Sequence, residues 1–468
     1  MSDAITPGGR VASASERIET SSPGLDTVAE RPTRPTGSTL FRFATAGSVD
    51  DGKSTLVGRL LHDSKAILAD QLESVARTSA ERGFGGEPGA IDFALLTDGL
   101  RAEREQGITI DVAYRYFSTG RRSFILADCP GHVQYTRNMV TGAATADAVV
   151  VLVDARKGVL EQTRRHLAVV QLLRVPHVIV AVNKIDLQGY DQGAFNAVAT
   201  DVTALTRELG LSAAHVIPVS ALAGDNIVER SSNTPWYDGP ALLELLETLP
   251  SLDELESELE ALRMPVQLVI RPQGAVAHDV DDAASFRDYR AFAGRIASGT
   301  VRVGDEVQVF PGGTTTTVTG IDAGRERLAA ASAPQSVSLR LADELDAARG
   351  AVIAASGSLP VPRREIEASV FQLDPRPLAP GARVLVKTGT STVQALVTAV
   401  HGRRDLTTLG LDPAERLEAN DIGQVSLKLS AELPVEAYAD HRRAGAFLVI
   451  HPQDGATLAA AIVTAPAA

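Results

Sequence analysis

One run of residues has the composition and spacing of a phosphate-binding loop. It reads Gly47-Ser48-Val49-Asp50-Asp51-Gly52-Lys53-Ser54, and Thr55 follows it. Glycines lack a β-carbon, so successive backbone N–H groups can close on a phosphate, while a lysine neutralises phosphate oxygens and a serine hydroxyl can bind Mg²⁺. An ordinary glycine-rich turn is the alternative. We predict that residues 47–55 bind nucleotide phosphates, with Lys53 in a catalytic role and Ser54 as a metal ligand.

Three further motifs each follow an apolar run that is typical of a strand. The Asp128 carboxylate could hold the shell of a magnesium ion, and the Gly131 N–H could approach a terminal phosphate. The Asp186 carboxylate could accept from the ring N–H and the amine of guanine, a donor pair that adenine lacks. Each motif alone also fits an ordinary turn, but their order favours a GTP/GDP site. The motifs are Asp128-Cys129-Pro130-Gly131-His132, Asn183-Lys184-Ile185-Asp186, and Ser220-Ala221-Leu222, whose backbone could donate to the guanine carbonyl.

Two residues are candidates for a switch that senses the γ-phosphate. The Thr109 hydroxyl would bind Mg²⁺ only in the presence of GTP, so the loop 106–110 would become ordered with GTP and loosen after hydrolysis. His132 could orient the attacking water, although a structural histidine is the alternative. We interpret Cys129 as a buried spacer rather than a reactive thiol, because the chain has no second cysteine.

The elements that must position these motifs alternate between strands and helices up to about residue 250. Such alternation predicts β-α-β units in a doubly wound, mainly parallel sheet, with the ligand at the edge where the strands end. The sequence therefore predicts a P-loop GTPase domain of the α/β class. Strands are expected at 40–46, 112–117, 123–127, 148–153, 177–182 and 215–219, and helices from 54 onward, continuing over 62–80, and at 160–173.

The pattern changes after the acidic segment 251–256, which reads as a helix end or linker. Short β-like runs punctuated by Gly, Pro, Asp and Thr follow, and a Pro-rich junction near 359–362 divides them into two pieces of barrel size. We expect strands at 265–270, 292–296, 301–310, 314–319, 367–372, 383–387 and 424–429. The expected domains are a disordered tail (1–37), a GTP-binding domain (38–250) and two β-barrels (262–358 and 361–468).

Composition narrows the class of partner. The chain has 468 residues, and 45 basic against 58 acidic residues leave a net charge of −13, which disfavours a nucleic-acid partner. No apolar run is long enough to cross a bilayer, and the first residues lack the apolar core of a secretory signal. The single cysteine is compatible with a reducing compartment. We therefore expect a cytoplasmic protein.

Beyond these motifs, the chain resembles the translation-factor-type GTPases, and within them one family in particular. Ser48 and Asp51 stand where translation elongation factors typically carry histidines. From about Phe41 to its end, the sequence is similar to the large, GTP-binding subunit of bacterial sulfate adenylyltransferases. The segments that carry this resemblance are 63–65, 101–117, 134–139, 235–237, 288–296 and 339–346.

The resemblance implies a division of labour between two subunits. GTP hydrolysis on this subunit would drive a smaller catalytic subunit, which binds ATP and sulfate, to form adenylylsulfate and pyrophosphate. Some relatives carry an adenylylsulfate kinase domain after the barrels, but the sequence contains no second phosphate loop, so kinase activity is not expected. Two alternatives remain open at this point: an elongation-factor-like GTPase that delivers aminoacyl-tRNA, and a GTP-dependent scaffold.

Overall fold

The fold is described from a computed structural model. It describes residues 39–67, 69–81, 91–96, 112–131, 136–211, 214–272 and 288–466. The expected tail at 1–37 and the switch candidates Thr109 and His132 lie outside these residues. Contacts group Ser38–Ala468 into one unit.

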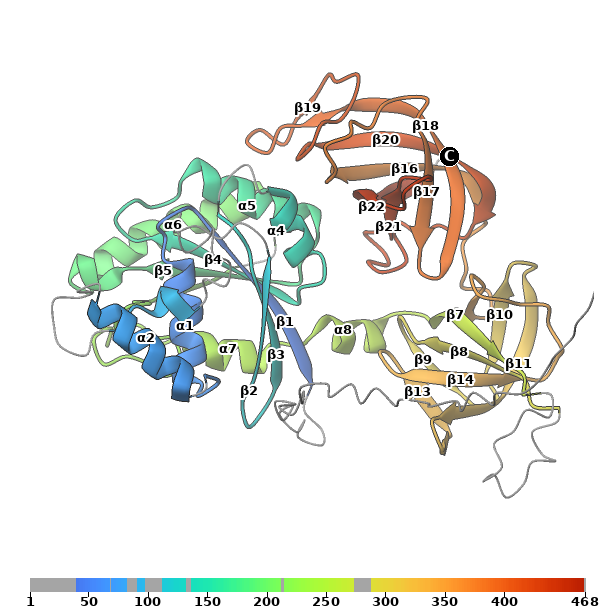
Figure 1. Ribbon diagram of the computed structural model, residues 1–468, viewed down its shortest axis with the longest axis horizontal. Coiled ribbons are helices and arrows are strands. Elements are labelled where there is room, and N and C mark those ends of the chain that lie inside the picture. Colours follow the sequence, from blue (N-terminus) through green and yellow to red (C-terminus); the bar gives the residue numbers. More distant parts are fainter. Residues whose placement is uncertain are drawn as a thin grey trace, which may run out of the picture. The chain divides into compact units, whose positions relative to one another are not determined.

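A six-stranded sheet forms the first part of this unit (Figure 1). Its order is β2-β3-β1-β4-β5-β6, and all neighbours pair in parallel except β2 and β3, which are antiparallel. The mainly parallel sheet expected from the sequence is therefore confirmed. The strands are β1 (Leu40–Gly47), β2 (Ala113–Ser118), β3 (Ser123–Asp128), β4 (Ala148–Asp154), β5 (His177–Asn183) and β6 (His215–Pro218).

Helices cover both faces of this sheet. Strand β4 is buried throughout, as its unbroken apolar sequence requires in a sheet covered on both sides. Its residues Val149 and Val151 pack with α4, α5 and α6, whereas Val150 and Leu152 pack with α1 and α7. The helices are α1 (Lys53–Asp63), α2 (Ala69–Glu81), α4 (Thr136–Ala143), α5 (Glu161–Leu172), α6 (Gln192–Glu208), α7 (Leu242–Thr248) and α8 (Leu252–Leu259), with short 3₁₀ turns η1 (Phe93–Leu96) and η3 (Ile185–Gln188).

The continuous helix expected over 62–80 is wrong. Helix α1 ends at Asp63, and α2 begins at Ala69. Between them Lys65 has a φ of 57°, a left-handed conformation that a continuing helix excludes. The composition of this segment favours helix on both sides of the break, so propensity alone could not locate it.

Two closed barrels follow the connecting helix α8. In the first, six strands close in the order β10-β15-β7-β8-β14-β11 and back to β10, and β12 extends β11. A pair, β9 and β13, stands apart from this sheet. The expected strand 301–310 is two strands, because a turn that includes Gly304 at φ 96° separates β9 from β10. The strands are β7 (Arg263–Ile270), β8 (Ala291–Arg295), β9 (Thr300–Arg302), β10 (Glu306–Phe310), β11 (Thr314–Ala323), β12 (Glu326–Leu328), β13 (Ala330–Ser332), β14 (Ser336–Leu341) and β15 (Val352–Ala355).

The second barrel closes in the order β17-β21-β22-β16-β20-β18 and back to β17, with β19 beside β18. Both barrels have alternating buried and exposed residues, such as the pattern of β20, and each encloses its own apolar core. The two barrels expected from the sequence are confirmed. The strands are β16 (Arg363–Gln372), β17 (Arg383–Thr388), β18 (Ser391–Arg404), β19 (Leu411–Asp412), β20 (Ile422–Leu433), β21 (Ala446–Ile450) and β22 (Thr457–Pro466).

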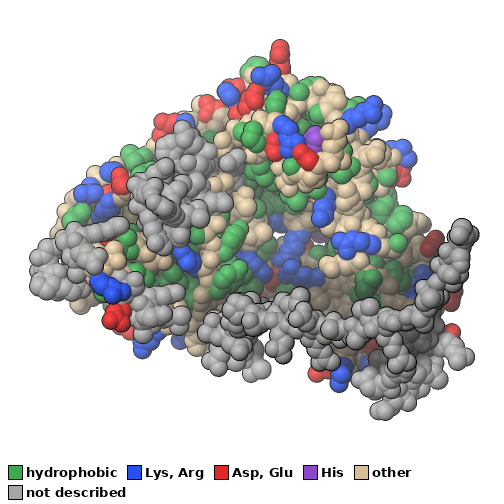
Figure 2. Space-filling view, in the orientation of Figure 1, with side chains coloured by type: hydrophobic (Ala, Val, Ile, Leu, Met, Phe, Trp, Pro, Cys, Tyr) green, Lys and Arg blue, Asp and Glu red, His purple; other side chains and the backbone are tan. Residues whose placement is uncertain are grey.

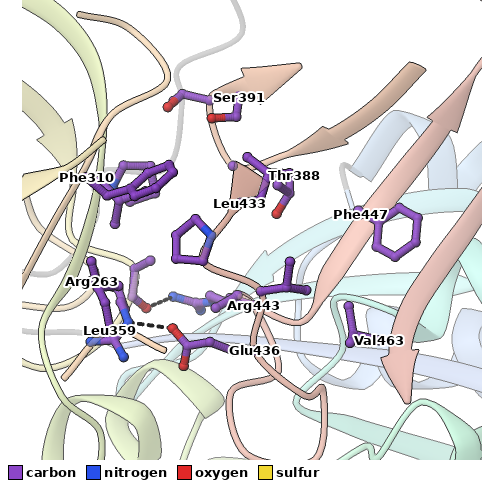
Figure 3. A pocket seen from close by; sticks show the side chains of 18 of the residues that line it. Arg263, Phe310, Leu359, Thr388, Ser391, Leu433, Glu436, Arg443, Phe447 and Val463 are labelled. Atoms are coloured by element: carbon purple, nitrogen blue, oxygen red, sulfur yellow. Dashed lines mark hydrogen bonds and ion pairs between the residues drawn. The ribbon is translucent and has the colours of Figure 1, made fainter. Parts of the chain in front are cut away.

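Buried polar contacts join the two barrels. Arg263 on β7 donates from Nε to Glu436 Oε1 at 2.6 Å, and both side chains are at most 9% exposed. Arg443 donates to the Ala297 carbonyl at 2.9 Å. Figure 3 shows these side chains on one wall of a cavity of about 170 Å³ that residues of both barrels line.

Candidate nucleotide-binding site

The predicted phosphate loop lies between β1, which ends at Gly47, and α1, which begins at Lys53. A β-carbon on Gly52, whose φ is 93°, would lie 2.4 Å from Asn183 Nδ2. On Gly47, with φ 149°, it would lie 3.0 Å from the Leu152 carbonyl oxygen. Both positions therefore require glycine for conformation and for space. The strand-loop-helix setting brings the backbone of the loop to the N-terminus of α1, as a phosphate site demands.

The Lys53 side chain is folded into the loop. Its Nζ donates to the carbonyl oxygens of Gly47 and Ser48, both at 2.8 Å, and the residue is 7% exposed. Burial lowers the pKa of Lys53, while the nearby carboxylates of Asp128 and Asp51 act in the opposite direction. The ammonium group is thus held where phosphate oxygens can replace the two carbonyls as acceptors.

Two buried polar atoms of the loop are unsatisfied. Asp51 accepts from the Ser48 N–H at 2.7 Å through one oxygen, but its Oδ1 and the Ser48 Oγ have no partner among the described residues. Burial raises the pKa of Asp51, whereas the hydrogen bond from the Ser48 N–H and the charge of Lys53 act to lower it. Buried polar atoms without partners are uncommon and costly. The loop therefore fits a bound ligand that supplies polar groups.

Asp128 is held at the end of β3 by a neighbouring strand. Thr45 on β1 pairs in register with Asp128, and its hydroxyl donates to Asp128 Oδ1 at 2.7 Å. Asp128 is 2% exposed. Sequence reasoning missed Thr45, although a hydroxyl in an otherwise apolar strand just before a phosphate loop is a usable signal. This bond fixes the orientation of the carboxylate that the sequence assigns to the metal shell.

Gly131 lies against the phosphate loop. A β-carbon here would lie 2.3 Å from Lys53 Nζ and 2.4 Å from the Gly47 carbonyl oxygen. Only glycine permits this approach between the Asp128 motif and the loop. Cys129 is fully buried, and burial raises the pKa of its thiol. Thiolate chemistry is therefore disfavoured at this position.

Asn183 joins three loops at the end of the sheet. Its Nδ2 donates to the Asp51 carbonyl at 2.7 Å, and its Oδ1 accepts from the Ala221 N–H at 2.9 Å. The Ala221 N–H is thus already used within the protein, and the Ser220 N–H bonds to the Asp225 carbonyl at 3.3 Å. Of the three backbone donors considered for the guanine carbonyl, only that of Leu222 has no acceptor in the described part of the chain.

Lys184 and Asp186 extend from the same strand end. Lys184, with φ 63°, donates to the Asp50 carbonyl and lies 3.1 Å from Asp154 Oδ2. Burial raises the pKa of Asp154, but hydrogen bonds from Arg156 and Lys184 outweigh it, and the carboxylate stays ionised. The half-buried Asp186 carboxylate has no hydrogen-bond partner among the described residues.

The structure brings the predicted segments 47–55, 128–131, 183–186 and 220–221 together at one end of the sheet. Asp154 was not among them, because an aspartate that ends a strand carries no motif. Thr109 and His132, which would complete the hydrolytic site, lie outside the described residues.

A phosphate loop, a carboxylate held at the adjacent strand end and a guanine motif bonded to the loop define a GTPase of the translation-factor type. Residues 38–256 match the family described as elongation factor Tu GTP binding domain, and residues 365–464 match the family described as GTP-eEF1A C-terminal domain-like. The chain is 48% identical to sulfate adenylyltransferase subunit 1 of Methylorubrum populi over 91% of its own length and 87% of the relative's. It belongs to the family of sulfate adenylyltransferase subunit 1.

Two other relatives agree with this assignment. The subunit 1 of Methylorubrum extorquens is 47% identical, again over 91% of this chain and 87% of the relative. The bifunctional enzyme CysN/CysC of Mycobacterium tuberculosis is 48% identical over 91% of this chain, which spans 67% of that longer protein. Among the described residues, no helix combines the length and apolar character needed to cross a membrane.

Proposed function

We propose that this chain is the GTP-hydrolysing subunit of a sulfate adenylyltransferase. In this function, GTP hydrolysis drives a smaller catalytic subunit to form adenylylsulfate and pyrophosphate from ATP and sulfate in the cytoplasm. The observation that carries the proposal is the Asn183 side chain, which ties the phosphate loop at Asp51 to the base-side loop at Ala221. This link supports guanine recognition and phosphate binding within one site. The domains proposed for this function are 38–250, 262–358 and 361–468.

Within that site, the chain's own residues divide the work. Backbone N–H groups of the loop and the Lys53 ammonium would bind the phosphates, and the Asp186 carboxylate would select guanine. Ser54 and Asp128, together with Thr109, would hold a magnesium ion. When bound, that ion would neutralise charge on the phosphate oxygens. The unsatisfied buried oxygen of Asp51 and the Thr45 hydrogen bond to Asp128 support a site that is preformed for such a charged group.

His132 is proposed to orient the attacking water. It follows Gly131, which lies against Lys53, so its place in the chain is next to the position of a terminal phosphate. Single-turnover GTP hydrolysis and GTP binding should therefore respond differently to His132→Ala. Hydrolysis should slow by more than the affinity for GTP falls, and an equal loss of both would contradict the role.

The coupling is tested with the complete complex of this chain and its small subunit. Adenylylsulfate formation from ATP and sulfate should increase on addition of GTP, and Lys53→Ala should remove this increase. Lys428→Ala, which changes a lysine on the surface of the second barrel, is the matched control and should keep it. Adenylylsulfate formation that is independent of GTP would refute the proposal.

A translation factor that delivers aminoacyl-tRNA was the alternative from sequence. The family assignment and the net charge of −13 do not favour it. Filter binding of aminoacyl-tRNA at physiological salt separates the two functions, and we expect no GTP-dependent retention.

A further inference from the structure

A second cavity lies where the nucleotide-binding part and the two barrels of the unit meet. Its volume is about 460 Å³. The nucleotide-binding part contributes residues from β1, from α4 and the loop after it, and from the end of α5, and α8 contributes Leu252. The first barrel contributes Arg295, and the second barrel contributes the remaining residues. Figure 2 shows Lys and Arg side chains gathered around a hollow near the centre of the view. The volume is that of a small-molecule site.

The polar lining of this cavity is cationic. Among the described residues it includes Arg42, Arg295, Lys387, Arg442 and Arg443 but no carboxylate. This excess of positive charge contrasts with the net charge of −13 of the whole chain. Arg442 is already engaged, because it donates to the Tyr438 hydroxyl at 2.8 Å and to the Ala144 carbonyl at 3.1 Å. Arg295 and Arg443 are engaged as well, because they donate to the carbonyls of Pro334 at 3.2 Å and Ala297 at 2.9 Å.

Three of these guanidinium groups converge on a single carboxylate. Asp253 on α8 lies 3.5 Å from Arg42 and 3.6 Å from Arg295, and it is bonded to Arg443. Burial raises the pKa of Asp253, but the three arginines outweigh it, so the group is ionised. Asp253 itself does not line the cavity, and Lys387 adds a further positive charge to the lining.

Other acidic groups near this cluster are occupied. Asp147 accepts from the backbone N–H groups of Arg42 at 2.6 Å and Leu252 at 2.8 Å. On the other side of Arg443, Glu436 is paired with Arg263, as Figure 3 shows, and the Glu260 carboxyl lies near Glu436 and has its pKa raised by burial. These carboxyl groups lie near the cluster but do not line the cavity.

Lys387, unlike the arginines, is not held in place by a side-chain interaction with another described part of the protein. It lies on β17, it is exposed, and it makes no hydrogen bond or ion pair with any described residue. Arginines that only fasten the barrels to α8 would not need a lysine beside them. Apolar side chains, including Phe371, Phe447 and Leu448, line the same cavity and could cover the uncharged body of a ligand.

We propose that this cavity binds a small anion that carries phosphate or sulfate groups and is no larger than a nucleotide. The anion would contact Lys387, Arg42 and Arg295, and its uncharged part would rest on the apolar wall. Because the lining comes from three parts of the chain, the bound anion would stabilise their observed arrangement. This site is separate from the guanine-nucleotide site and does not depend on the function proposed above.

Calorimetric titration of the full chain, preloaded with GDP so that the phosphate loop is filled, tests the proposal. The probes are inorganic pyrophosphate, inorganic sulfate and ATP, which separate inorganic from nucleotide anions. At least one should bind with one site per chain, and Lys387→Gln should weaken it by about tenfold or more, the effect of losing a charge-assisted contact. Lys428→Gln is the matched control, since Lys428 is the other lysine of this barrel and lies on its surface. It should leave the affinity within about twofold.

A second variant distinguishes anion binding from a purely structural role of the arginines. Asp253→Asn removes the carboxylate that competes with the ligand for three arginines, so it should tighten anion binding several-fold. If these arginines only stabilise the contact between α8 and the barrels, Asp253→Asn should lower the midpoint of thermal unfolding, and the variant should bind no anion. Absence of binding for all three probes at about 1 mM would overturn the proposal. An equal effect of the two lysine substitutions would also overturn it.

Discussion

Replacement of Asn183 by alanine should weaken guanine-nucleotide binding far more than it weakens the fold. The side chain is 1% exposed and makes two hydrogen bonds, one to the Asp51 carbonyl at 2.7 Å and one from the Ala221 N–H at 2.9 Å. In the unliganded variant, the two loops can relax toward water, so much of the cost is recovered. Binding must then bring them back together without their link.

The magnitude follows from the two groups left without partners. A buried donor or acceptor that loses its partner costs about 1–3 kcal/mol, so the pair costs about 2–6 kcal/mol when the nucleotide restores the closed arrangement. Since about 1.4 kcal/mol corresponds to tenfold in affinity, the dissociation constant for GDP should rise at least about 30-fold. Titration with a fluorescent GDP analogue measures this change directly.

The matched control is Asn226→Ala. Asn226 is equally buried and donates to the Pro218 carbonyl at 2.8 Å and to the Thr234 hydroxyl at 2.9 Å, but it has no bond to the phosphate loop in the described residues. Asn226→Ala should lower the free energy of unfolding about as much as Asn183→Ala does. It should change the affinity for GDP by less than about threefold. If both variants lose GDP affinity equally, the role assigned to Asn183 is wrong.

Three further outcomes are expected. Gly131→Ala should slow GTP hydrolysis at least about tenfold in a single-turnover assay, because its β-carbon would displace Lys53 or the loop carbonyl beside it. Asp186→Asn should shift preference from guanine toward xanthine nucleotides in competition binding, since an amide presents a donor where a carboxylate accepted. Tyr438→Phe should lower the free energy of unfolding in a denaturant titration by about 1–2 kcal/mol, because its hydroxyl donates to the buried Leu173 carbonyl at 2.8 Å.

Local motifs explain how much of the nucleotide site could be predicted. The phosphate loop and the guanine motif each lie within a few residues, and parallel strands bring their ends to one edge, so spacing and strand order suffice. The loop between α1 and α2 could not be predicted, because both flanks favour helix. The hydrogen bond from the Ala221 N–H to Asn183 Oδ1 could not be predicted either, because the two residues are far apart in sequence.

The cationic cavity could not be predicted from the sequence at all. Arg42, Asp253, Arg295 and Lys387 lie in four different elements, and no local spacing relates them. Each also fits the ordinary pattern of its element, as an exposed or half-buried residue of a strand or a charged residue in the first turn of a helix. Only the packing of the barrels and α8 brings these charges together, so the cluster carries information that is purely tertiary.

Strand β1 provides a physical link between the two sites. Arg42 contributes to the cavity, and Gly47 begins the phosphate loop five residues later, about 17 Å along a strand that is buried from Phe43 to Gly47. If binding at one site alters the other, the effect must be reciprocal, because the coupling free energy is shared. One factor is the change in pyrophosphate affinity when a non-hydrolysable GTP analogue replaces GDP. The other is the change in the ratio of the affinities for these two nucleotides when pyrophosphate is added. The two factors should be equal. Two calorimetric series measure both factors. Equal factors near one would show that the sites are independent, whereas unequal factors would mean that pyrophosphate also enters the phosphate loop.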